Sequence, residues 1–158
     1  MVNLEKSIAQ GKTVITLIGV RQAREGYAFI HQGSSPNCKN CGYYRVCIEN
    51  LEEGRVYRVV GLRENVFQCG VHEGGVRVVE VVESDIEAAL PLRMAMEGAL
   101  IPFQKLECEA ISCINHEFCV PRGLVDGDRC TILKIDEKIE CPEGLSLVKV
   151  LLHRLPST

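Results

Sequence analysis

Eight of the nine cysteines fall into two sets of four with nearly equal spacing. The first set is Cys38, Cys41, Cys47 and Cys69, and the second is Cys108, Cys113, Cys119 and Cys141. The last three members match at an offset of 72 residues, and only the first is displaced, by two. In a chain with so few cysteines, three such matches have a chance probability of roughly two in ten thousand. The chain therefore contains two copies of one unit, each with four thiols.

The repeat extends beyond the cysteines. At the same offset of 72, Arg21, Ala23, Glu25, Gly26, Val76 and Val78 reappear as Arg93, Ala95, Glu97, Gly98, Val148 and Val150. Residues 13–84 form the first copy and residues 85–156 the second, and no Pro/Gly-rich linker separates them. We expect one compact body with an internal pseudo-twofold axis.

Length and composition favour a functional metal site over a structural one. A chain of 158 residues with 46% hydrophobic content can bury about 70% of its unfolded surface without metal staples. The apolar stretch 13–20 is too short to span a membrane, and no signal peptide is expected. The sequence predicts a cytoplasmic protein with no membrane association, in which clustered cysteines act as thiolate ligands and not as disulfides.

Charge gives little support to a nucleic-acid partner. The net charge is −3; the first copy has eight basic and eight acidic residues, and the second has eight and twelve. Neither copy is a basic surface. Arg55, Arg58 and Arg63 could form a local patch, but a solvated strand edge balanced by nearby glutamates is the favoured interpretation. Nucleic-acid binding is therefore open but not indicated.

The chain is predicted to be mainly β, with a minor helical part. Runs rich in β-branched and aromatic residues, bounded by glycine, indicate four strands in each copy. The predicted strands are 14–20, 27–31, 55–62, 76–82, 86–90, 100–106, 129–135 and 145–152. Residues 21–26 and 93–98 are each expected to form one helical turn ended by glycine. The duplicated four-strand units could close into one barrel or pair as two small barrels, and the sequence leaves both open.

The cysteine spacing favours iron–sulfur clusters. Three ligands come from one loop, Cys38, Cys41 and Cys47, and Cys69 arrives from the hairpin after the third strand. The four irons of a cubane cluster are spread over a wider volume than a single ion, so three ligands from one loop and one remote ligand suit a cluster. We predict two [4Fe–4S] clusters, with the eight paired cysteines as ligands.

Zinc is the alternative cofactor, with two ions per chain. Structural zinc usually takes two short knuckles, and Cys69 with His72 could pair with Cys38 and Cys41, leaving Cys47 out. At the offset of 72, however, His72 corresponds to Gly144, whereas Cys47 is retained as Cys119. Four cysteines per copy is the common feature.

The ninth cysteine and two further features receive structural interpretations. Cys130 lies in a predicted strand, corresponds to Arg58 at the offset of 72, and is expected to be a buried thiol. His116 is predicted to be an exposed loop histidine, although a hydrogen bond to cluster sulfur is the alternative. Gly74-Gly75 is predicted to form a hairpin turn. Common nucleotide, protease and esterase motifs are absent, and no catalytic residue is predicted.

Several segments resemble an uncharacterised, mostly archaeal family of cysteine-rich proteins, the UPF0179 type. The segments are residues 14–19, Cys38 to Cys41, residues 74–81, and Glu97-Gly98 before the second set. The resemblance covers nearly the whole chain. It implies an archaeal source and a cytoplasmic address, and it carries no activity.

The sequence thus predicts a binding protein more than an enzyme. Four thiolates per cluster leave no iron open for substrate, which favours electron transfer to a redox or complex partner protein, or a role as complex subunit. The rival class is a zinc-stabilised module that binds protein or RNA. Cys141 precedes Pro142, as in two-cluster ferredoxins, so Cys69 and Cys141 could ligate either their own copy's cluster or the other one.

Overall fold

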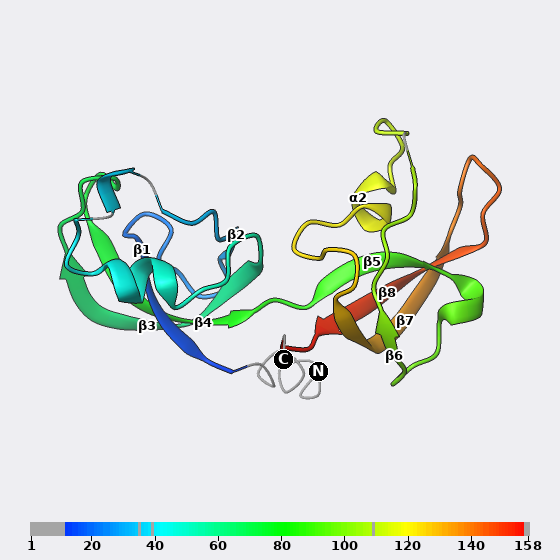
Figure 1. Cartoon of the computed structure of the whole chain (residues 1–158), viewed down its shortest axis with the longest axis horizontal. Coiled ribbons are helices and arrows are strands. Elements are labelled where there is room, and N and C mark those ends of the chain that lie inside the picture. Colours follow the sequence, from blue (N-terminus) through cyan, green and yellow to red (C-terminus); the bar gives the residue numbers. More distant parts are fainter. Residues whose placement is uncertain (1–11, 35, 39, 109, 157–158) are drawn as a thin grey trace. The chain divides into compact units, whose positions relative to one another are not determined.

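Each half of the chain forms its own four-stranded antiparallel sheet. The computed structural model describes residues 12–34, 36–38, 40–108 and 110–156. The chain divides into two compact units with the boundary between Ser84 and Asp85. Strand order is β1-β4-β3-β2 in unit 1 and β5-β8-β7-β6 in unit 2 (Figure 1). The predicted mainly β, duplicated fold is confirmed, and of the two arrangements left open the strands form separate sheets. The pseudo-twofold axis stays a prediction.

All eight predicted strands are present, with changed ends. They are β1 (Val14–Gly19), β2 (Ala28–Ile30), β3 (Val56–Phe67), β4 (Val76–Glu83), β5 (Ile86–Pro91), β6 (Leu100–Pro102), β7 (Arg129–Ile139) and β8 (Leu147–Arg154). β3 and β7 run further than predicted, because they pair with the whole length of β4 and β8. β6 stops at Pro102, well short of the predicted end at residue 106.

Helical structure is short and lies mostly in the cysteine loops. The elements are η1 (Pro36–Cys38), η2 (Arg45–Glu49), η3 (Leu92–Met94) and α2 (His116–Cys119). The helical turn predicted at 21–26 is wrong: these residues form hydrogen-bonded turns, and at 93–98 only η3 is helical. Gly26 and Gly98 end the two segments with φ of 86° and 84°, a conformation that favours glycine.

Matching hydrogen bonds show which residues of the two units are equivalent. Gly26 N–H donates to Val59 O at 2.9 Å, and Gly98 N–H donates to Ile132 O at 2.7 Å. Likewise His31 N–H donates to Arg55 O at 2.9 Å, and Phe103 N–H donates to Asp128 O at 2.6 Å. Equivalent residues of the two units are therefore 72 positions apart around β2 but 73 positions apart at the start of β3.

The constant offset of 72 is wrong for the long hairpins. Tyr57 pairs with Phe29 as Cys130 pairs with Ile101, so Cys130 is equivalent to Tyr57 and not to Arg58. Similarly, Val76 pairs with Gly19 and Leu147 with Pro91, so Val76 and Val78 match Leu147 and Lys149 rather than Val148 and Val150. Bulges in β3 and β7 and unequal hairpin lengths account for the drift.

Each unit has a hydrophobic core of its own. In unit 1, Val59, Val79 and Val81 are at most 1% exposed. In unit 2, Ile132, Val150 and Leu152 are fully buried, and Cys130 packs among them with 0% exposure. The prediction of a buried Cys130 thiol is confirmed.

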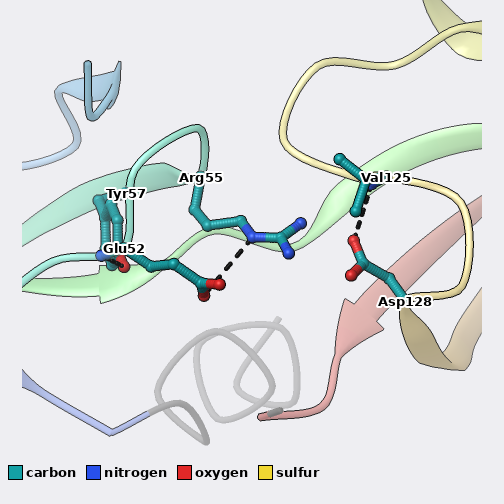
Figure 2. Close-up of polar contacts among 5 residues, drawn as sticks. All are labelled: Glu52, Arg55, Tyr57, Val125 and Asp128. Carbon is teal, nitrogen blue, oxygen red and sulfur yellow. Dashed lines mark hydrogen bonds and ion pairs between the residues drawn. The ribbon is translucent and has the colours of Figure 1, made fainter. Parts of the chain in front are cut away.

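The loops before β3 and β7 are held in two different ways. In unit 1 the Glu52 N–H donates to the Tyr57 hydroxyl at 2.8 Å, and the Glu52 carboxylate lies 3.5 Å from Arg55 Nε (Figure 2). In unit 2 the Val125 N–H donates to Asp128 Oδ2 at 2.8 Å. Arg55 is only 7% exposed, so its assignment to a solvated strand edge is wrong. Its guanidinium is a structural group beside the loop.

Separate cores predict separate responses to cavity mutations. Leu152→Ala should lower the free energy of unfolding of unit 2 by about 2–5 kcal/mol, because it leaves a cavity in a fully buried cluster. Leu100→Ala, at a side chain that is 51% exposed, is the matched control and should cost about 1 kcal/mol or less. Hydrogen exchange read by mass spectrometry should show lost protection in β5–β8 and little change in β1–β4. Equal loss in both units would contradict separate cores.

Candidate metal centres

The four thiols of unit 1 come together around one cavity. Cys38 ends η1, Cys41 lies in the turn that follows, Cys47 is inside η2, and Cys69 lies in the β3–β4 hairpin. All four line a cavity of about 40 Å³, with Leu17, Tyr43 and Val76 among its walls. No charged side chain lines it among the described residues. Cys69 thus joins the cysteines of its own copy.

Three side-chain hydrogen bonds fasten η2, which carries Cys47, to the sheet. Thr16 Oγ1 donates to Cys47 O at 3.3 Å, and Asn50 Nδ2 donates to Ile15 O at 2.8 Å. Just after β2, His31 Nε2 lies 3.1 Å from Ile48 O, and since a carbonyl only accepts, Nε2 carries the proton. η2 is therefore held from β1 and from the residue that follows β2.

The sulfur atoms of unit 1 receive hydrogen bonds from the backbone. Tyr43 N–H donates to Cys41 Sγ at 3.5 Å, and Val71 N–H donates to Cys69 Sγ at 3.4 Å. The Tyr43 ring stacks on Phe67 with 4.5 Å between centroids, which connects the cysteine loop to the end of β3. Such bonds stabilise thiolates and tune any metal they hold.

The four thiols of unit 1 lie so close together that their ionised forms are unfavourable when no metal is bound. Burial raises the pKa of the Cys47 thiol to about 11, and the charges of Cys38, Cys69 and Cys41 add to the rise. Four thiolates can share this cavity only if a cationic group compensates them. The donor set therefore fits a metal ion or cluster.

Unit 2 repeats the arrangement in a more open and more acidic form. Cys108 follows β6, Cys113 lies in a turn, Cys119 ends α2, and Cys141 lies in the β7–β8 hairpin. Cys108, Cys119 and Cys141 line a cleft of about 750 Å³ together with Glu107 and Glu143. Cys113 and Cys141 line a second cleft of about 510 Å³.

Electrostatics and packing bring the second set into one group. Burial raises the pKa of Cys119, with further contributions from Cys108, Cys113 and Cys141. Cys108, Cys119 and Cys141 also belong to one hydrophobic cluster with Ala89 and Leu147. Asn115 Nδ2 donates to Glu140 O at 3.3 Å, which ties the turn before α2 to the hairpin that carries Cys141. All eight cysteines chosen from the sequence thus lie in two groups of four.

A mononuclear site requires ligands that converge tightly on one point. Four thiolates on one zinc lie about 3.8 Å apart, because each Zn–S bond is about 2.3 Å long. Within the described parts of the chain, no three His, Cys, Asp or Glu side chains converge closely enough to hold a single ion. The four thiols of unit 1 nevertheless line one cavity, and in unit 2 Cys141 belongs to both clefts.

The two histidines considered from the sequence, His72 and His116, do not belong to the two groups of cysteines. His72 lies in the wall of an adjoining cleft that also includes Cys38, Cys47 and Cys69. His116 begins α2; it is partly buried, and its Nδ1 is enclosed without a hydrogen-bond partner, so the exposed position predicted for it is wrong. Thr16, His31 and Asn50 were not singled out from the sequence, because each acts on the backbone beside a cysteine and not on the sulfur.

Comparison with known proteins gives a family. The profile of the uncharacterised protein family UPF0179 matches residues 14–152. The chain belongs to this family. A UPF0179 relative from Methanocaldococcus jannaschii is 41% identical over 140 residues, covering 88% of this chain and 93% of the relative. Relatives from Methanosarcina mazei (40% over 148 residues, 92% and 99% covered) and Pyrococcus horikoshii (43% over 142, 89% and 99%) are similar.

The family resemblance inferred from sequence segments is therefore confirmed. No solved structure matches the chain. Among the described residues, the helices are all too short or too polar to cross a bilayer. The expected absence of a signal peptide concerns residues 1–11, which lie outside the described ranges.

The bond from His31 to Ile48 predicts a specific pH dependence. Burial lowers the pKa of His31 below 6.5, and the hydrogen bond to Ile48 and the charge of Glu53 oppose this only in part. The fold thus favours neutral His31, so its contribution to stability is present above pH 6.5 and is lost as pH falls through the lowered pKa.

His31→Phe should weaken this dependence, because a phenyl ring does not titrate; unit 2 has Phe103 at the equivalent place, which makes phenylalanine the suitable replacement. Urea unfolding at about pH 8 and about pH 5 gives the free energy of unfolding of each protein at the two pH values. The stability loss on acidification should be smaller in the variant than in the wild type. Identical losses of unfolding free energy in the two proteins would show that the pKa of His31 does not change on unfolding.

Proposed function

We propose that the protein binds two [4Fe–4S] clusters, one in each unit, and acts as an electron carrier or as the redox subunit of a larger complex. The observation that carries this is the grouping of four thiols in each unit: in unit 1 all four line one cavity, and in unit 2 Cys108, Cys113 and Cys141 lie close enough to help raise the pKa of Cys119. Cys38, Cys41, Cys47 and Cys69 would hold one cluster, and Cys108, Cys113, Cys119 and Cys141 the other. When bound, such clusters accept and release single electrons.

The surroundings of the thiols support this choice. Apolar side chains such as Leu17, Val76 and Leu147 line the space beside the sulfur atoms. Backbone N–H groups bond Cys41 and Cys69 sulfur, which is a recurrent means of setting cluster potential. With four cysteines per cluster no iron position is left for a substrate, and this favours electron transfer over catalysis at iron.

A partner protein has a favourable place to approach the second centre. Ile111 and Ile114 flank Cys113 and are 81% and 90% exposed. Exposed apolar side chains beside a thiol centre suit a transient protein contact. We place the protein in the cytoplasm, where free thiols persist.

Zinc remains the second candidate, as the core of a protein- or RNA-binding module. The specific observation in its favour is that His72 shares a cleft with Cys38, Cys47 and Cys69 in unit 1. The β7–β8 hairpin of unit 2 has no histidine, so two such sites would need different ligand sets.

Metal analysis separates the two candidates. Protein purified without oxygen should contain about eight iron and eight acid-labile sulfide per chain, with a brown colour that dithionite bleaches. A colourless chain with about two zinc ions would contradict the cluster proposal and establish the module.

Single-cysteine variants test the ligand sets. Cys47→Ser and Cys119→Ser should each remove about four iron, because each takes one thiolate from a different cluster. Cys130→Ala is the matched control, since Cys130 lies in the core of unit 2 away from both groups, and it should retain the full iron content. Full iron in both serine variants would exclude four-cysteine ligation.

A further inference from the structure

A cleft in unit 1 adjoins the first thiol cavity and extends beyond it. Its volume is about 460 Å³, and its lining comes from β1, β2 and the β3–β4 hairpin. At one end it shares Cys38, Cys47 and Cys69 with the thiol cavity. Small-molecule sites usually measure about 300–1,000 Å³, and the cleft falls in this range.

One wall of the cleft is aromatic. Tyr27 and Phe29 lie on the same side of the β2 segment, and their rings stack with centroids 6.1 Å apart and planes 18° apart. Both side chains pack against the core cluster of unit 1 but are only partly buried, and both line the cleft. Two nearly parallel rings present flat surface on which a third ring can stack.

Polar groups meet at the end of β1. A methyl group on Gly19 would collide with Gln22 Oε1 and would lie 2.9 Å from His72 Nδ1. The glycine therefore allows an amide and an imidazole to approach each other over the strand end. An amide offers both a donor and an acceptor, and an imidazole one of each when neutral, so this end can bind the polar edge of a ligand.

The charge of the lining limits what can enter. Among the described residues that line the cleft there is no Asp, Glu, Lys or Arg. Three thiols occupy one end, and as thiolates they would repel an anion. Since no described residue of the lining carries a fixed positive charge that would neutralise a phosphate or carboxylate, we expect the part of the ligand inside the cleft to be uncharged.

The second unit shows that the fold does not require this lining. Matching hydrogen bonds make Tyr27 equivalent to Ala99 and His31 to Phe103, and Phe29 then matches Ile101. Phe103 and Ile101 are 1% and 8% exposed and belong to the core of unit 2. At these positions unit 2 thus has the aliphatic Ala99 and Ile101 where unit 1 has two partly exposed aromatic rings.

We propose that this cleft binds an uncharged planar aromatic molecule beside the first metal centre. Its ring lies against Tyr27 and Phe29, and its polar edge bonds to Gln22 and His72. The ligand is a partner of unit 1 alone. The proposal goes beyond electron carriage and does not depend on which metal the thiols hold.

Three related probes test the proposal on the full chain with its metal in place. They are naphthalene-1-carboxamide, which is planar and neutral, the anionic naphthalene-1-carboxylate, and the non-planar decahydronaphthalene-1-carboxamide. Calorimetry and ligand-observed NMR should show one site that prefers the planar amide to each of the others by about ten-fold or more. Iron and zinc are measured on the same samples, so failure of the cluster proposal is recorded separately.

Variants locate the site. Tyr27→Ala and Phe29→Ile introduce the residues of unit 2 and should each weaken binding of the planar amide about ten-fold. Gln22→Met should weaken it about five-fold through a lost hydrogen bond. Gly19→Ala adds only a methyl group at a position without a left-handed φ, and should block the polar end while the fold is kept. Val66→Ala, on an exposed side chain outside the cleft, should bind as the wild type does.

Several results would overturn the proposal. Absence of binding to folded, metal-loaded protein would do so, as would equal affinity for the three probes. Binding that persists unchanged in Tyr27→Ala, Phe29→Ile and Gly19→Ala would place the probe elsewhere. Binding only to metal-free protein would show that the cleft is the space of the metal centre itself.

Discussion

The register of the long hairpin in each unit decides where the fourth cysteine lies, and the thiol groups depend on it. In unit 1 the pairing of Phe67 with Val76 returns the hairpin so that Cys69 lines one cavity with Leu17 of β1. In unit 2 the pairing of Ile139 with Leu147 brings Cys141 into one cluster with Ala89 of β5. The three-thiol loops would otherwise have no fixed partner. Side-chain bonds from Thr16, His31 and Asn50 then hold the loop of unit 1 against this fixed point.

Much of the fold could be read from the sequence, because its strongest signals are local or repeated. Runs of β-branched residues located all eight strands, and the duplicated cysteines located both thiol groups. The position of Cys130 in an apolar strand sufficed to predict a buried thiol. These features depend on pattern and spacing, which a single sequence contains.

Other features depend on contacts that no spacing reveals. Unit 2 has one residue more before β7, one fewer in the β7 bulge and one fewer in the β7–β8 hairpin. The paired cysteines therefore keep an offset of 72, whereas the start of β3 has an offset of 73 and β4 one of 71. The burial of Arg55 follows from its loop, not from its strand pattern. The cleft beside Gly19 could be recognised only once Gln22, Tyr27 and His72 were found to line the same space.

The loops before β3 and β7 carry a consequence for how the two halves could be exchanged. Glu52, Arg55 and Tyr57 occupy the positions that Val125, Asp128 and Cys130 occupy in the other half, so a base stands where its counterpart has an acid and a phenol where its counterpart has a thiol. Each loop uses an anchor that the other half lacks (Figure 2). The halves are therefore no longer interchangeable modules, and a chimaera made by moving one of these residues must move its companions with it.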